Sequence, residues 1–118
     1  MRKLTRSECP VATTVDVIRG KWKPLILFAL REGPQRFGAL LRAIDGATQK
    51  VLTEQLRQLE REEIVERRVD DRAPLLKVEY SLSGHGQSLR PILNAMCDWG
   101  LDHRSRSRHR LRAVAASR

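Results

Sequence analysis

The feature that most constrains the fold is a change in hydrophobic period near residue 63. Residues 48–62 carry apolar side chains at helical spacing on one face, namely Val51, Leu52, Leu56 and Leu59. Residues 64–69 and 76–82 are instead rich in β-branched and aliphatic side chains, and two acids and a proline lie between them. This order predicts an amphipathic helix, capped by Thr48, that leads into a β-hairpin with a loop longer than a tight turn.

Three shorter helices are predicted before this pair. Cys9-Pro10 opens a helix over residues 11–18, and Pro24 opens a second one that stops before Gly33-Pro34. Because the second helix is apolar almost all round, we expect it to be buried at the centre of the domain. Arg36-Phe37 is too short for more than a bridge of strand, and a third helix is expected over residues 38–44.

The turn Asp45-Gly46 separates this third helix from the one that starts at Thr48. Two helices flanking a turn, with a polar face on the second and a hairpin after it, predict a winged helix-turn-helix. The expected fold class is therefore mainly α with a small β-hairpin (α+β), with additional N- and C-terminal dimerisation helices.

Ser83 is expected to cap a last helix that runs to Asp102, a length of about 30 Å, which Pro91 would kink or split in two. Its apolar stripe comprises Leu89, Ile92, Leu93, Met96 and Trp99. The stripe could pack into the chain's own core, but so small a domain has little left to cover it. We therefore favour a homodimer interface, which three N-terminal residues would join: Val11, Val15 and Ile18.

The charge is basic and uneven. The 118 residues carry a formal net charge of +9, and six arginines but no acid follow Asp102, so residues 1–102 carry only +3. Such a balance favours nucleic acid or an anionic surface as partner. We expect residues 1–102 to form the domain and residues 103–118 a basic, disordered tail.

Several classes of protein are not expected. The longest wholly apolar run, residues 25–30, is far too short for a membrane span, and the charged N-terminus leads into no signal-peptide core. Cys9 and Cys97 cannot form a disulfide framework, which suits a cytoplasmic protein. We expect no enzyme, cofactor or metal, because the three histidines lack ligand spacing and Gly84-His85-Gly86 lacks the context of a phosphate loop.

A series of short motifs occurs in order between about Cys9 and Gly100: Cys9-Pro10-Val11, Gly20-Lys21-Trp22-Lys23, Arg36-Phe37, Thr48-Gln49-Lys50-Val51-Leu52-Thr53, Leu56-Arg57-Gln58-Leu59-Glu60, Val78-Glu79-Tyr80-Ser81-Leu82, Gly86, Leu89-Arg90-Pro91 and Trp99-Gly100. Together they resemble the HxlR-type winged helix-turn-helix transcriptional regulators, relatives of the MarR-like group. The resemblance implies a dimeric bacterial regulator that binds a double-stranded DNA operator. Its helix from Thr48 would enter the major groove, and its hairpin would lie along the backbone or minor groove.

Four residues on that helix are candidates for DNA contact besides Thr48. Gln49 can pair with adenine, Arg57 can reach guanine or phosphate, and Lys50 suits a phosphate. Thr53 can touch a base or a thymine methyl. The alternative is an ordinary solvated helix face, and Glu54 on the same side would repel phosphate unless it meets a cytosine amino group.

The wing carries four cations around its loop: Arg67, Arg68, Arg72 and Lys77. They could contact phosphates and the minor groove, or they could be edge-strand charges that prevent aggregation. Among them Arg72 is the leading candidate, although the paired acids Asp70-Asp71 at the tip depart from the family pattern. Arg36 could anchor a phosphate beside the helix-turn-helix.

The resemblance also singles out Cys9, because some HxlR-type regulators respond to oxidants or electrophiles through a cysteine at this Cys-Pro position. The positive end of the following helix favours an anion such as a thiolate. Cys97 of a second copy is the one other thiol with which oxidised Cys9 could pair. The alternative is a small residue that is simply packed.

Three functions therefore stand as hypotheses. The first is a sequence-specific transcriptional regulator, a repressor or autoregulator, with an oxidant or small-molecule inducer. The second is a non-specific nucleic-acid binder that works mainly through its tail. The third is a protein–protein adaptor that uses the last helix without DNA. Competition between specific and random duplexes distinguishes the first two, since specific binders exceed non-specific sites by roughly 10³ or more.

Overall fold

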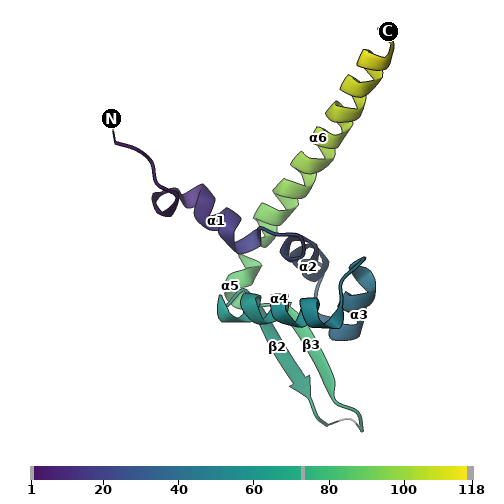
Figure 1. The fold of residues 1–118 in the computed structure, drawn as a ribbon. Helices are drawn as coiled ribbons and strands as arrows, with labels where there is room; N and C mark the ends of the chain where they lie inside the picture. The colour runs from purple at the N-terminus through teal and green to yellow at the C-terminus, as the bar shows by residue number, and fades with distance from the viewer. Residues whose placement is uncertain (1, 73, 117–118) are drawn as a thin grey trace. The chain divides into compact units, whose positions relative to one another are not determined.

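The computed structural model describes residues 2–72 and 74–116, which fall into two units, residues 1–87 and residues 88–118 (Figure 1). The second unit is essentially one long helix. The elements in chain order are a 3₁₀ turn η1 (Arg6–Glu8), α1 (Pro10–Ile18), α2 (Lys23–Leu30), β1 (Gln35–Arg36), α3 (Phe37–Ala43), α4 (Gln49–Arg61), β2 (Val65–Asp70), β3 (Lys77–Leu82), α5 (Gly84–Gln87) and α6 (Arg90–Ala116).

The core of the first unit lies among α2, α3, α4 and one face of the sheet. Its largest fully buried side chains are Ile26, Leu27, Leu30, Leu40, Leu52, Leu56 and Leu59. The expectation that α2 is buried on all sides is wrong, because Leu25 and Phe28 are 46% and 49% exposed. The elements around α2 cover only the face that carries Ile26, Leu27 and Leu30, and the Arg31 guanidinium lies 4.2 Å from the centroid of the Phe28 ring.

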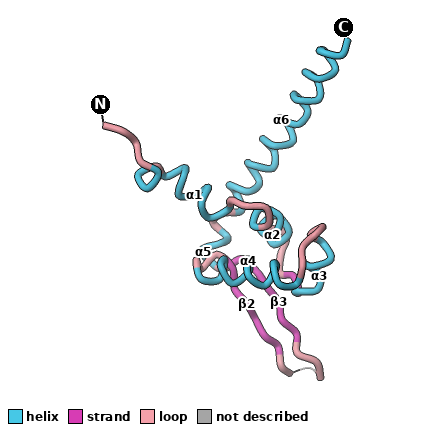
Figure 2. The backbone as a smooth tube through the Cα atoms, viewed as in Figure 1, coloured by secondary structure: helices cyan, strands magenta, loops and turns pink. Residues whose placement is uncertain are grey.

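The sheet has three antiparallel strands in the order β1-β3-β2, so the predicted hairpin is confirmed and gains a short third strand. Figure 2 shows the β2–β3 hairpin in magenta, ending in a loop at its tip. The expected bridge is formed by Gln35 and Arg36, which pair with Tyr80 and Glu79. Phe37 begins α3 instead, so no linker separates β1 from the helix-turn-helix.

A buried serine joins the end of α4 to the hairpin and to α5. Glu63 takes a left-handed conformation with φ of 62°, which turns the chain from α4 into β2. The Ser83 hydroxyl donates a hydrogen bond to the Glu63 carbonyl at 2.5 Å and accepts one from the Gly86 amide at 2.8 Å. The Ser83 amide also donates to the Ile64 carbonyl at 2.9 Å. We call this set of bonds the Ser83 clamp.

The second unit agrees with one expectation, a split at Pro91, and differs from another, the disordered tail. The helix is split ahead of Pro91, between α5 and α6, and Pro91 is the second residue of α6, where its missing N–H leaves no broken bond. The tail expected to be disordered from residue 103 is helical to Ala116, and residues 117–118 lie outside the described part. Arginine, alanine and leucine are strong helix formers, and neither glycine nor proline follows Gly100. Helix α6 is thus about 40 Å long.

The Ser83 clamp predicts that Gly86→Ala destabilises the domain. A Cβ at residue 86 would lie 2.0 Å from the Ile64 carbonyl oxygen, a backbone atom that cannot move without displacing the hairpin. We expect a loss of about 1–3 kcal/mol in the free energy of unfolding, as for other overpacked sites, measured by urea denaturation. Gly84→Ala is the matched control, because nothing lies within 4 Å of its Cβ position. Equal stability of the two variants would contradict the role of the clamp.

Candidate nucleic-acid interface

Helix α4 presents one buried and one polar face. Thr48 caps the helix as predicted, since its side-chain oxygen accepts a hydrogen bond from the Val51 amide at 3.1 Å. The buried face is the leucine row that joins the core. The opposite face exposes three of the predicted contact residues together with one acid: Gln49, Lys50, Arg57 and Glu54. The amphipathic helix and its cap are thus confirmed, and contact of these side chains with DNA remains a prediction.

Thr53, half-buried on this face, has its hydroxyl proton engaged within the helix. Its Oγ1 donates to the Gln49 carbonyl at 2.8 Å, one turn earlier. This bond uses the single donor of the hydroxyl and fixes the side-chain rotamer. The methyl group and the oxygen lone pairs are then the parts of Thr53 that remain for a ligand. Of the two roles left open by the sequence, contact with a thymine methyl is the one this geometry favours.

The short strand β1 brings Arg36 onto the wing. Arg36 and Arg68 both pair with Glu79, from opposite sides of β3, so strand alternation places all three on one face of the sheet. Lys77 lies two residues from Glu79 on that same face. A shallow hollow of ≈ 530 Å³ is lined by these residues together with Val69, Asp70, Asp71 and Arg72. The sequence alone placed Arg36 beside the helix-turn-helix; pairing across the sheet is not visible in a linear pattern.

Arg72, the leading wing candidate, is already engaged with an acid of the same loop. Its backbone N–H and its Nε donate to Asp70 Oδ1 at 3.1 and 3.2 Å. These hydrogen bonds, from the backbone first, lower the pKa of Asp70 below its ordinary value, so the carboxylate stays charged beside Arg72. Arg67 lies on the face of the hairpin opposite Arg68. The polar face of the wing therefore carries Arg36, Arg68 and Lys77 interleaved with the acids Glu66, Asp70 and Glu79, and Arg68 lies 4.0 Å from Glu66.

The predicted dimer surface is partly confirmed as exposed. Val11, Val15, Ile92, Met96 and Trp99 are all exposed in the single chain, and the Trp99 ring stacks on His103 at a centroid distance of 4.8 Å. Ile18, Leu89 and Leu93 are 6%, 9% and 8% exposed, and contact of these three with a partner stays a prediction. Leu25 and Phe28 on α2 are large apolar side chains that are also partly exposed, 46% and 49%, and the sequence analysis did not single them out.

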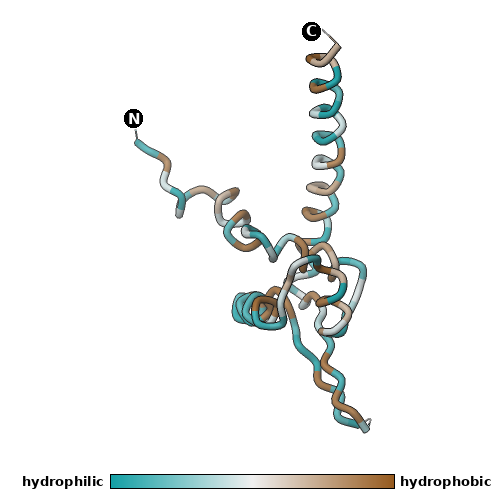
Figure 3. Tube along the Cα trace, turned by 45° about the vertical axis from the view of Figure 1, so that its right-hand side comes forward, coloured by the Kyte–Doolittle hydropathy of each residue, from teal (hydrophilic) through white to brown (hydrophobic). Residues whose placement is uncertain are grey.

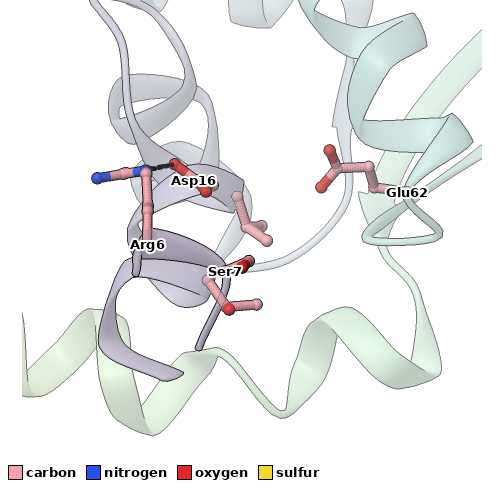
Figure 4. Close-up of a pocket in the computed structure, with 6 residues that line it drawn as sticks. Arg6, Ser7, Asp16 and Glu62 are labelled. Atoms are coloured by element: carbon pink, nitrogen blue, oxygen red, sulfur yellow. Dashed lines mark hydrogen bonds and ion pairs between the residues drawn. The ribbon is translucent and has the colours of Figure 1, made fainter. Parts of the chain in front are cut away.

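Cys9 lies at the joint between η1 and α1, as the N-cap of α1, and is half-buried. Arg6 on η1 and Asp16 on α1 form a hydrogen-bonded ion pair that spans this joint (Figure 4). The hydrogen bond from Arg6 lowers the pKa of the Asp16 carboxyl. An open pocket of ≈ 470 Å³ beside the pair is lined by Arg6, Ser7, Thr13, Asp16, Val17 and Glu62. A chemical change at Cys9 would therefore occur beside an exposed ion pair that joins η1 to α1.

Within residues 2–72 and 74–116, no three His, Cys, Asp or Glu side chains are grouped so that they could hold a metal ion. None of the helices described is both long and apolar enough to cross a membrane.

Comparison with known proteins agrees with this geometry. The family model described as HxlR-like helix-turn-helix matches residues 17–108. The uncharacterized HTH-type transcriptional regulator YdeP of Bacillus subtilis (strain 168) is 44% identical over 98 residues, which cover 83% of this chain and 76% of YdeP.

Solved structures give the same result. The redox regulator HypR in its reduced form is 44% identical, with a TM-score of 0.76 over 81% of this chain and 94% of HypR. The oxidised form of HypR is 45% identical, with a TM-score of 0.72 over 80% of this chain and 96% of the other.

Proposed function

The chain belongs to the HxlR-like helix-turn-helix family of transcriptional regulators, and from this membership we propose that it binds an operator in double-stranded DNA as a homodimer. It acts as a sequence-specific repressor or autoregulator in the cytoplasm, by binding and not by catalysis. The observation that carries the proposal is the polar face of α4, held outward by its buried leucines and followed at once by a wing whose surface carries arginine and lysine side chains among acids.

Base recognition is assigned to α4 because the major groove admits one helix and presents a distinct pattern of donors and acceptors for each base pair. Gln49 and Arg57 are exposed side chains of the types that pair with adenine and guanine edges. Lys50, Arg36 and Lys77 supply charge for phosphates, which fixes register but not sequence. Substitutions of the base-contacting residues should therefore change specificity, and substitutions of the phosphate-contacting residues should change affinity for all sequences.

We predict that Arg57→Ala and Gln49→Ala each lower specificity. A base-edge contact contributes about 1–3 kcal/mol of discrimination, so the preference for a duplex selected from a random pool should fall by about tenfold or more. Binding competition against random duplex measures the ratio. Lys50→Ala is the matched control, expected to weaken both duplexes equally. A wild-type ratio near one would instead favour the non-specific binder, and no binding to any duplex would favour the adaptor.

The Thr53 hydrogen bond gives a second prediction. If its methyl packs on a thymine methyl, replacing that thymine by deoxyuridine should weaken wild-type binding by about 0.8 kcal/mol, or about fourfold. Thr53→Ser, which keeps the hydroxyl and loses the methyl, should bind the two duplexes equally. Thr53→Val should keep the thymine preference. The reverse pattern in the two variants would assign the contact to the hydroxyl.

Dimerisation is assigned to the exposed stripe of α6 together with α1. We predict that Met96→Asp with Trp99→Asp yields monomers that lose tight operator binding, because two half-sites must be held about one helical turn apart. Leu101→Asp is the control, since Leu101 is 56% exposed on the opposite side of α6. Sedimentation measures the oligomeric state. A monomeric wild type at micromolar concentration would overturn the assignment.

Cys9 is proposed as the residue through which an oxidant or electrophile acts. In this reaction the Cys9 thiolate attacks hydrogen peroxide, the O–O bond breaks, and sulfenic acid and hydroxide result. Cys97 of the second copy can then form a disulfide with release of water. The support is the position of Cys9 at the joint held by Arg6 and Asp16, and the likeness to a regulator solved in reduced and oxidised forms.

We predict that a mild oxidant or a quinone lowers operator affinity of the wild type but not of Cys9→Ser. Cys97→Ser distinguishes the two stages, because it blocks the disulfide and leaves sulfenic acid formation intact. Operator affinity before and after treatment is the measurement, and mass spectrometry identifies the product. Equal responses of wild type and Cys9→Ser would leave Cys9 a packing residue.

A further inference from the structure

The last part of α6 carries a dense and unbalanced charge. Residues 103–116, here called the arginine arm, hold five arginines and no acid, and all five side chains are exposed. The family model ends at residue 108, within the arm, so its last turns lie outside the matched region. We propose that the arginine arm binds the phosphate backbone of duplex DNA without reading its sequence. The proposal rests on the regulator function above and adds a second contact to it.

The helix sorts the arginines into two strips. Arg104, Arg108 and Arg112 follow at intervals of four residues, within about 80° of one another around the helix at 100° per residue. Each step advances about 6 Å along the axis. Arg106 and Arg110 form the other strip, where the Arg106 Nε donates to the Asp102 carboxylate at 2.8 Å and Arg110 contacts Ser107. Asp102 thus offsets charge on the second strip, and the first strip is the stronger cationic surface.

Repulsion between neighbouring arginines in each strip destabilises the helix unless an anion lies beside them. Like charges four residues apart destabilise a helix by about 0.2–0.5 kcal/mol per pair, and the arm has three such pairs. Exposed arginines that served only solubility would be as effective with acids interspersed. A polyanion removes the repulsion, and the guanidinium group binds phosphate oxygens through two parallel hydrogen bonds. Figure 3 shows hydrophilic segments, in teal, recurring along α6.

The partner best suited to the arm is duplex DNA. A second copy of the arm is a disfavoured partner, because two arginine-rich helices would repel each other. The large exposed apolar side chains that such a contact could bury are Leu111 and Val114. The family function already brings the chain to DNA, which presents one negative charge per about 1.7 Å of axis. An acidic protein is the other class of partner, and the test below separates it from DNA.

The test replaces the first strip in the full chain, as Arg104→Gln with Arg108→Gln and Arg112→Gln. The affinity for a selected and a random duplex is measured by fluorescence anisotropy over a range of salt concentrations. Loss of three phosphate contacts should reduce the salt slope, d log K/d log [salt], by about 2–3 per bound chain on both duplexes. The ratio between the two duplexes should not change. The matched control places lysine at the same three positions, and its slope should stay close to that of the wild type.

The outcomes separate this inference from the proposed function. An unchanged slope in the glutamine variant, with its helicity and dimer mass intact, overturns the arm as a DNA contact and leaves an acidic protein as its partner. A changed preference between the duplexes overturns the claim that the arm does not read sequence. A wild type with no preference contradicts the proposed function alone, because the slope on random duplex still tests the arm.

Discussion

The structure depends on the one-sided burial of α4. Leu52, Leu56 and Leu59 are each 1% exposed, and they leave the helix a single orientation relative to the rest of the first unit. A helix whose apolar row is buried cannot rotate without exposing it, at about 1.5–3 kcal/mol for each leucine that leaves the core. The polar face is thereby fixed by residues that touch no ligand. The packing of the core thus determines which side chains of α4 face outward.

The Ser83 clamp fixes the orientation of the wing relative to α4. One hydroxyl joins the left-handed turn at Glu63 to the start of α5, and the Ser83 amide binds the Ile64 carbonyl. Since both ends of the hairpin pass through this point, the wing leaves the domain in a direction set by the end of α4. Helix and wing are positioned by shared backbone atoms, which suits the proposed function, in which both elements contact one stretch of DNA.

Periodicity predicted the elements well where neighbouring residues decide the structure. The cap at Thr48, the helix after it and the hairpin follow from local pattern, and the structure confirms them. Three features could not be predicted in this way. Arg36 reaches the wing through strand pairing across more than forty residues, Leu89 and Leu93 are 9% and 8% exposed, and one side of α2 is left open. Each depends on contacts between residues that are far apart in the sequence, and the local hydrophobic pattern does not show which segments pack together. An Arg–Ser alternation is typical of a solvated coil, yet most residues after residue 103 favour a helix, and the structure is helical there.

Strand β1 has a mechanical consequence. It pairs with β3 and passes at Phe37 into α3, so the two-residue strand ties the wing to the helix-turn-helix with no slack between them. The helix-turn-helix and the wing are thus expected to move together as one rigid unit. In the proposed complex with DNA, the distance between the groove that would receive α4 and the backbone that would meet the wing is then set by the protein, and only the spacing between half-sites is left for the rest of the chain to adjust. A base pair inserted within a half-site should therefore weaken binding more than one inserted between half-sites, and the difference in affinity would report how rigidly α4 and the wing are joined.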